Sequence, residues 1–371
     1  MSSYHVQVGS DYGAYLVQWS RVLTGENPWD LNEPIFNAYG PLYNSIAIFS
    51  HVHPLLPKLI FSLSWIAISL YLMKILYQRY SEDSLTMLAG FLFLFANPFL
   101  WISISMQGFF DILPAICCVM AVIFRSKRRF ILAALFLAIG FLFKFYPIVL
   151  FPILVIDNRR IRVLPGITYF IFITVGFLVS FLIWGESTFN PLIFASARDS
   201  KILSIFFFLK SRFSPLRLFT EQPNLDNYSN YTMIIGYLVV VFYTWKRRIE
   251  SSLSAIIYMM IVLVLYRTGH FQFFTSIFLI SPFWYATTNL SKSRKEKILV
   301  PISIYLYWIT ILHLTFYLFK GIGPWPWSLF REIAGLPNLL LSLWTIVTVV
   351  RLGYSSSELL PTKKNQSLIR R

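Results

Sequence analysis

Long apolar stretches separated by short clusters of Lys and Arg restrict the fold of this chain more than any other feature. Stretches such as 57–77 and 163–184 contain no acidic residue and are long enough to cross a bilayer as helices. Only 13% of the residues are charged, about half the fraction of a soluble domain. The pattern excludes a soluble α/β enzyme, a disulfide scaffold and a disordered chain. It predicts an all-α, polytopic membrane protein, with one integral membrane domain over residues 1–371.

The region 130–156 differs from an ordinary span because Lys144 stands in the middle of an apolar stretch, between Gly140 and the prolines Pro147 and Pro152. Proline removes an intrahelical hydrogen bond and lysine is costly in lipid. We therefore expect a re-entrant hairpin of two half-helices that meet near Lys144. About nine full spans are expected beside it, at 57–77, 85–105, 109–124, 163–184, 231–245, 252–266, 270–288, 298–318 and 335–352.

The basic clusters predict the orientation, because Lys and Arg accumulate in cytoplasmic loops. Clusters at 125–129, 159–162, 246–248 and 292–297 all fall on one face when the spans are threaded, as does the basic tail 353–371. The opposite, extracytoplasmic face receives a first loop at 1–54 and a second at 185–230. In the second loop, 198–212 has charged ends around an apolar middle and suits a helix at the membrane interface. Because 1–54 lies outside with no preceding span, we expect a further helix upstream.

Asp11 precedes a helical pattern formed by Tyr12, Tyr15 and Trp19, and Gly25 ends that pattern. A carboxylate at this place has two interpretations. It is an ordinary N-cap, or it is a general base whose pKa is adjusted at the membrane surface. The residues by themselves favour the cap.

Other polar residues near the outer ends of spans also have two interpretations. A lysine at the position of Lys144 needs an anion or a water-filled cavity. Helix capping, snorkelling or hydrogen bonding accounts for the remainder as well as substrate contact does. Metal-ligand spacings, Asp-x-Asp and nucleotide-binding motifs are missing from the sequence, so we expect no metal, no cofactor and no nucleic-acid partner. Besides Lys144, the polar residues near the outer ends of spans are Gln107, Asp111, Arg267, His270 and Gln272.

Three separated motifs resemble those of GT-C glycosyltransferases. The first comprises Asp11-Tyr12, the turn Thr24 to Trp29 and the box Tyr39 to Tyr43. The second, Gly140 to Pro147, is similar to a Lys-x-Tyr-Pro box, and the third is Gly269 to Phe274. The nearest relatives by resemblance are the polyprenyl-phosphate-mannose-dependent mannosyltransferases of glycosyltransferase family 87 and the first mannosyltransferase of GPI-anchor synthesis.

The resemblance implies an inverting hexosyltransferase in the cell membrane, with its active site on the extracytoplasmic face. It would move a hexose, most commonly mannose, from a polyprenyl-phosphate donor to a lipid or glycan acceptor. Asp11 would be the general base, and Lys144, His270, Arg198 and Arg267 would bind the donor phosphate. The family's first span is missing here, and Phe274 stands where a tyrosine is common. The substrate-binding residues implied are Tyr12, Tyr39, Tyr43, Gln107, Asp111, Tyr146 and Gln272.

Three alternatives remain open. A polysaccharide polymerase or ligase also has many spans and outer arginines, but typically uses a large late outer loop. A non-enzymatic lipid-glycan transporter would show internal repeats and paired charges at mid-membrane, whereas Lys144 has no partner apparent in the sequence. The chain could also be an inactive member of the family that serves as an assembly subunit.

Overall fold

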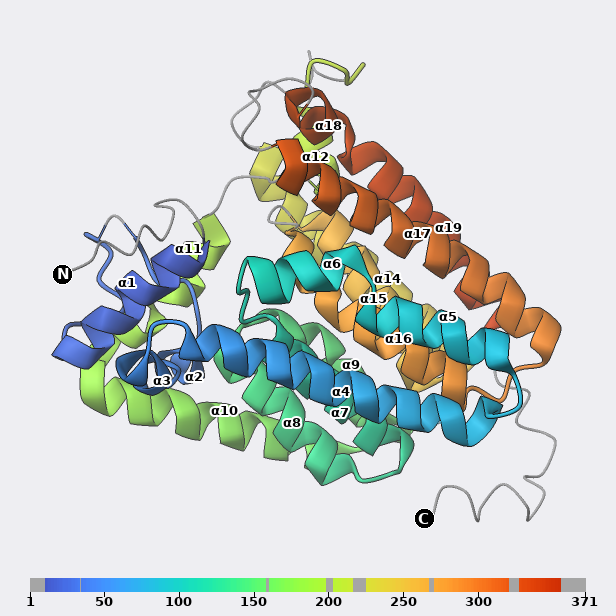
Figure 1. Cartoon of the computed structure of the whole chain (residues 1–371), viewed down its shortest axis with the longest axis horizontal. Helices are drawn as coiled ribbons and strands as arrows, with labels where there is room; N and C mark the ends of the chain where they lie inside the picture. Colours follow the sequence, from blue (N-terminus) through green and yellow to red (C-terminus); the bar gives the residue numbers. More distant parts are fainter. Residues whose placement is uncertain are drawn as a thin grey trace.

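The structure is a computed structural model that describes residues 11–33, 35–157, 160–197, 203–215, 225–266, 270–319 and 327–354. Helices dominate this part of the chain. Its only sheet is one antiparallel pair of two-residue strands, β1 (Ile156–Asp157) and β2 (Arg160–Ile161). The predicted all-α class is therefore confirmed (Figure 1).

Five helical segments of the described chain are long and apolar enough to cross a membrane. Two of them include breaks. Ser84–Met106 joins three short helices, and Val163–Phe194 continues α10 past Gly185. The segments are α4 (Leu56–Tyr80), α5 (Ser84–Phe95) with α6 (Pro98–Leu100) and the π-helix η1 (Trp101–Met106), α10 (Val163–Trp184) with η3 (Gly185–Phe189) and part of α11 (Asn190–Ala197), α17 (Lys292–Phe319), and α19 (Gly335–Leu352).

Further helices complete the bundle, and each predicted span coincides with helix in the structure. The spans predicted at 163–184 and 335–352 agree with α10 and α19 at both ends. The further elements of the bundle are α7 (Ile112–Ser126), α8 (Phe130–Phe143), η2 (Tyr146–Leu150), α9 (Phe151–Val155), α14 (Leu225–Arg247), α15 (Ser251–Leu265), η4 (Phe271–Phe274) and α16 (Thr275–Thr287).

The predicted break at Lys144 is confirmed. Helix α8 ends at Phe143, and Lys144 adopts an extended conformation with φ −157° and ψ 139°. Pro147 then lies in the first turn of η2, where its missing N–H costs no hydrogen bond. A Cβ on Gly140 would lie 3.0 Å from the Cβ of Cys117, so the glycine lets α7 and α8 pack closely next to the break.

Helices that lie outside the bundle gather at its ends. Figure 1 shows α1 (Asp11–Thr24), α2 (Pro41–Asn44), α3 (Ala47–Val52) and α11 together at one end of the molecule. Helix α12 (Ile205–Leu209) and α18 (Trp327–Ile333) lie near the start of α19. In the part of 198–212 that is described, α12 buries Ile205, Phe206 and Phe208.

The basic cluster at the start of α17 contacts the ends of two other helical segments. Lys295 donates a hydrogen bond to the hydroxyl of Tyr80, which links the start of α17 to the end of α4. Arg294 donates to the hydroxyl of Tyr354 at 3.0 Å, beyond the end of α19. These contacts bring three terminal segments of the bundle together.

Candidate active site

One face of α1 forms an aromatic cluster with the segment that follows it. Tyr12, Tyr15 and Trp19 recur at helical spacing and are buried, as the sequence pattern predicts. Their rings contact rings from two other segments, with centroid separations of 4.5–6.4 Å across the group. We call this group the aromatic cluster; its members are Tyr12, Tyr15, Trp19, Tyr39, Tyr43 and Phe110.

Glycine and tryptophan position the Tyr39 to Tyr43 box. The N–H of Gly40 donates to the carbonyl of Phe143 at 3.1 Å, and a Cβ on Gly40 would overlap the Leu142 carbonyl. Only glycine therefore allows the box to lie on the end of α8. Trp29 is buried, and its Nε1 donates to the carbonyl of Tyr39 at 3.1 Å. The predicted Thr24 to Trp29 turn thus fixes the box from its other side.

Lys144 has a partner that the sequence does not reveal. Its Nζ donates to Oδ1 of Asp111 at 2.7 Å, and both side chains are buried. The ammonium also lies 5.2 Å from the ring centroids of Tyr39 and Phe110 and 4.6 Å from that of Phe273. Cation–π attraction adds to the ion pair here. Two predicted site residues, 33 positions apart, therefore form one charged unit beside the aromatic cluster.

Asp11 is exposed and is the first residue of α1. Its negative charge affects the pKa of two tyrosines in the aromatic cluster. Burial raises the pKa of the Tyr15 hydroxyl well above its usual value, and the carboxylates of Asp11 and Asp111 raise it further. Burial and the charge of Asp11 also raise the pKa of Tyr43. Because Asp11 is exposed and directly precedes the buried Tyr12 in α1, the carboxylate that the sequence singles out lies at the open edge of the cluster.

The third motif reaches the same place through Phe273. The ring of Phe273 lies 5.2 Å from that of Tyr146 and 6.0 Å from that of His270. The hydroxyl of Tyr146 is 2.9 Å from Oγ of Ser276. His270 is half-buried, while Gln272 is buried. Segments from three predicted motifs thus surround Lys144.

Several buried polar atoms of the predicted site residues and of Tyr15 have no hydrogen-bond partner among the described residues. Three are acceptors, namely Oε1 of Gln107, Oδ2 of Asp111 and Oε1 of Gln272. The hydroxyl of Tyr15 is the fourth. Buried acceptors without donors are costly. A ligand rich in hydroxyl groups would supply the missing donors.

Not every predicted residue can be placed. Arg198 and Arg267 lie outside the described residues. Conversely, sequence reasoning missed Phe110 and Phe273 as walls around Lys144. Phe110 follows Gly108, whose φ of +69° and close approach to Tyr12 turn the chain toward the cluster. Gly108 is therefore the sequence feature that could have pointed to Phe110. The described residues contain no group of three His, Cys, Asp or Glu that could hold a metal ion.

Comparison with known proteins places the chain in a family. The family profile described as glycosyltransferase family 87 matches residues 38–282, which is more than half of the chain. The chain therefore belongs to glycosyltransferase family 87. No curated protein and no solved structure gives a significant match.

Membership of family 87 identifies the protein as a membrane glycosyltransferase with a sugar donor and an acceptor. The family 87 match covers Tyr39, Lys144 and Gln272, and begins after Asp11. Two of the three motifs that carry the resemblance thus lie inside the matched region.

Proposed function

We propose that this glycosyltransferase moves a hexose, with mannose the first choice, from a polyprenyl-phosphate donor to a lipid or glycan acceptor. The reaction takes place on the extracytoplasmic side and inverts the anomeric carbon. The observation that carries the proposal is the convergence of three motifs around Lys144, with Asp11 at the edge of the same aromatic cluster.

Asp11 acts as the general base. Its carboxylate removes the proton from an acceptor hydroxyl, whose oxygen then attacks the anomeric carbon of the donor. The bond from that carbon to the phosphate oxygen breaks, and the phosphate monoester leaves with the electron pair. A single displacement of this kind inverts the configuration. The exposure of Asp11 supports the role, because an acceptor must reach the carboxylate from outside the buried cluster.

Lys144 and His270 contact the donor phosphate, with assistance from Arg198 or Arg267. Developing negative charge on the leaving group is stabilised by fixed cations. Asp111 holds Lys144 in place through Oδ1, and its second oxygen Oδ2 accepts a hydroxyl of the sugar. Gln107 and Gln272 present further acceptors to the same sugar. The aromatic rings of Tyr12, Tyr39, Tyr43 and Tyr146 provide apolar surface for the sugar face.

The distribution of charge supports the extracytoplasmic location. Basic residues lie at the ends of α4, α7, α14 and α19 and at the start of α17. In membrane proteins such residues accumulate in cytoplasmic loops. The aromatic cluster lies at the start of α4 and the end of α8, which are the opposite ends of those helices. A polyprenyl tail could remain in the bilayer while its phosphate meets Lys144.

The decisive experiment measures transfer of radiolabelled mannose from polyprenyl-phosphate-mannose in membranes that contain wild type or Asp11→Asn. We expect the substitution to abolish transfer, with the amount of protein in the membrane unchanged. Asn caps a helix as well as Asp does, so a purely capping role predicts near-normal transfer. Equal transfer by both proteins would therefore overturn the assignment of Asp11. If neither protein transfers mannose but the wild type transfers another hexose from its polyprenyl-phosphate donor, the assignment of mannose is overturned.

A further inference from the structure

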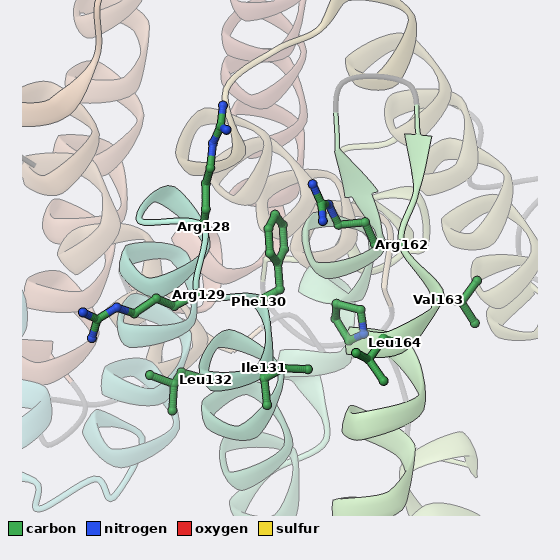
Figure 2. Close-up of a pocket in the computed structure, with 9 residues that line it drawn as sticks. Arg128, Arg129, Phe130, Ile131, Leu132, Arg162, Val163 and Leu164 are labelled. Carbon is green, nitrogen blue, oxygen red and sulfur yellow. The ribbon is translucent and has the colours of Figure 1, made fainter. Parts of the chain in front are cut away.

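A second basic site lies at the other end of α8 from Lys144. The turn between α7 and α8 and the first turn of α10 line a cavity of about 580 Å³, shown in Figure 2. In that view the ring of Phe130 lies between the side chains of Arg128 and Arg162, while Arg129 extends to the other side. The nine lining residues include three arginines and no acid. The lining thus carries positive charge that an anion would balance.

Arg162 is held rigidly at the edge of this cavity. Its Nε and Nη2 bind Oδ2 of Asp157 at 2.8 and 2.7 Å, and its guanidinium lies 4.2 Å from the ring centroid of Phe130. Arg125 binds the other carboxylate oxygen of Asp157 at 3.0 Å and lies 4.6 Å from the same ring centroid. One acid therefore serves two arginines, and Arg128 adds a further positive charge beside them.

The starts of the two helices add to the positive potential. Arg129 is the N-cap of α8 and Arg162 is the N-cap of α10, and neither side chain caps the first-turn N–H groups of its helix. The first turns of both helices line the cavity. Helix N-termini carry partial positive charge. This partial charge adds to the positive potential of the arginines, which supply most of it.

An apolar groove of about 640 Å³ continues from the cavity, with Arg162 and Val163 in both linings. It follows α10 as far as Val175, and Phe151 and Val155 of α9 form its other wall. Thirteen residues of helix extend about 20 Å. A leaflet of hydrocarbon is about 15 Å thick. The groove is therefore long enough for an acyl chain that reaches toward the middle of the bilayer.

We propose that this surface binds an anionic glycerophospholipid. The headgroup phosphate contacts Arg128 and Arg162 at the mouth of the cavity, and one acyl chain follows the α9–α10 groove. Arginine pairs with phosphate through charge and hydrogen bonds together. The joined apolar groove favours a lipid over a soluble phosphate, because free phosphate would leave the groove of about 640 Å³ without an apolar occupant.

The backbone at Arg128 offers a test that separates binding from folding. Arg128 follows α7 with φ 59°, a conformation that favours glycine. The N–H groups of Arg128 and Arg129 donate to the carbonyls of Arg125 and Phe124. Arg128→Gly thus removes the charge and relieves the backbone at once. A matched control exists in Arg248, which follows α14 with φ 54° and has the same pattern of hydrogen bonds to Trp245 and Thr244 through its own N–H and that of Ile249.

The experiment compares purified wild type, Arg128→Gly and Arg248→Gly in detergent, with added phosphatidylglycerol, with phosphatidylcholine of the same acyl chains, or with inorganic phosphate. Thermal unfolding measures stability, and native mass spectrometry counts retained lipid. We expect phosphatidylglycerol alone to raise Tm of the wild type and to remain bound. Arg128→Gly should weaken its apparent affinity about fivefold or more, as the loss of one basic residue near an anionic lipid predicts. Arg248→Gly should retain the wild-type affinity.

Because glycine suits both positions, each variant should be at least as stable as wild type without lipid, and a folding defect cannot imitate the result. Equal affinities of the two variants for phosphatidylglycerol would overturn the proposal. Equal stabilisation by phosphatidylcholine would show that the net charge of the headgroup does not matter. That result would also overturn the proposal. The same rise in Tm with inorganic phosphate would assign the cavity to a free anion and refute the lipid.

Discussion

At the scale of single residues, the Lys144–Asp111 pair is a buried ion pair inside the candidate site. Both side chains are buried, with 8% and 1% of their surfaces exposed. Breaking a buried pair leaves one charge uncompensated and costs about 3–5 kcal/mol, whereas removing both charges is much less costly. The pair therefore allows a structural role to be separated from a role in donor binding.

We expect Lys144→Met to lower the free energy of unfolding by about 3–5 kcal/mol, because Asp111 is left unpaired. Lys144→Met/Asp111→Asn should recover much of this loss, yet its KM for the sugar donor should stay raised. Thermal unfolding in detergent and donor saturation curves measure the two quantities. A double variant with wild-type stability and an unchanged donor KM would remove Lys144 from the donor site.

At the scale of elements, the site depends on how the Tyr39 to Tyr43 box lies on the end of α8. Gly40 allows this contact because any side chain there would overlap the Leu142 carbonyl, which belongs to the backbone and cannot rotate away. The chain must then shift, and Tyr39 and Tyr43 must shift with it.

We expect Gly40→Ala to reduce transfer about 10–100-fold in protein that remains folded, because displacement of a site by about 1 Å has effects of this size. Gly185→Ala is the control, since a Cβ there meets nothing within 4 Å. Its φ of +62° with ψ −147° strongly favours glycine, so this substitution should cost about 1–3 kcal/mol of stability. Transfer assays normalised to folded protein compare the two. Similar specific activities would show that the contact with α8 does not position the site.

At the scale of the whole molecule, the basic clusters and the aromatic cluster occupy opposite ends of helices, and this separation predicts the orientation in the membrane. The two natural cysteines, Cys117 and Cys118, are buried, so introduced cysteines can report accessibility with little background. Ser45 and Ser126 are both exposed and belong to opposite ends.

In intact cells, a membrane-impermeant thiol reagent should label Ser45→Cys and leave Ser126→Cys unmodified. After permeabilisation both positions should react, which shows that the second site is accessible in principle. Labelling of Ser126→Cys alone in intact cells would invert the topology and place the proposed site in the cytoplasm.

The sequence by itself determined the helical class, the positions of the main helices and the break at Lys144. These features follow from local composition and from proline and lysine within an apolar stretch, which act over a few residues. It also indicated the motifs of family 87, because each motif is contiguous in the chain. The agreement of α10 and α19 with the predicted limits shows how strong these local signals are.

Only the tertiary structure decided which side chains meet. Asp111 and Lys144 are 33 residues apart, and nothing in either segment identifies the other as its partner. Phe110 and Phe273 likewise become walls of one site only when α7, α8 and η4 pack together. The cavity at Arg128 and Arg162 arises in the same way, from two helix starts that the chain brings side by side. Such contacts depend on packing between distant segments, and local sequence patterns carry no information about them.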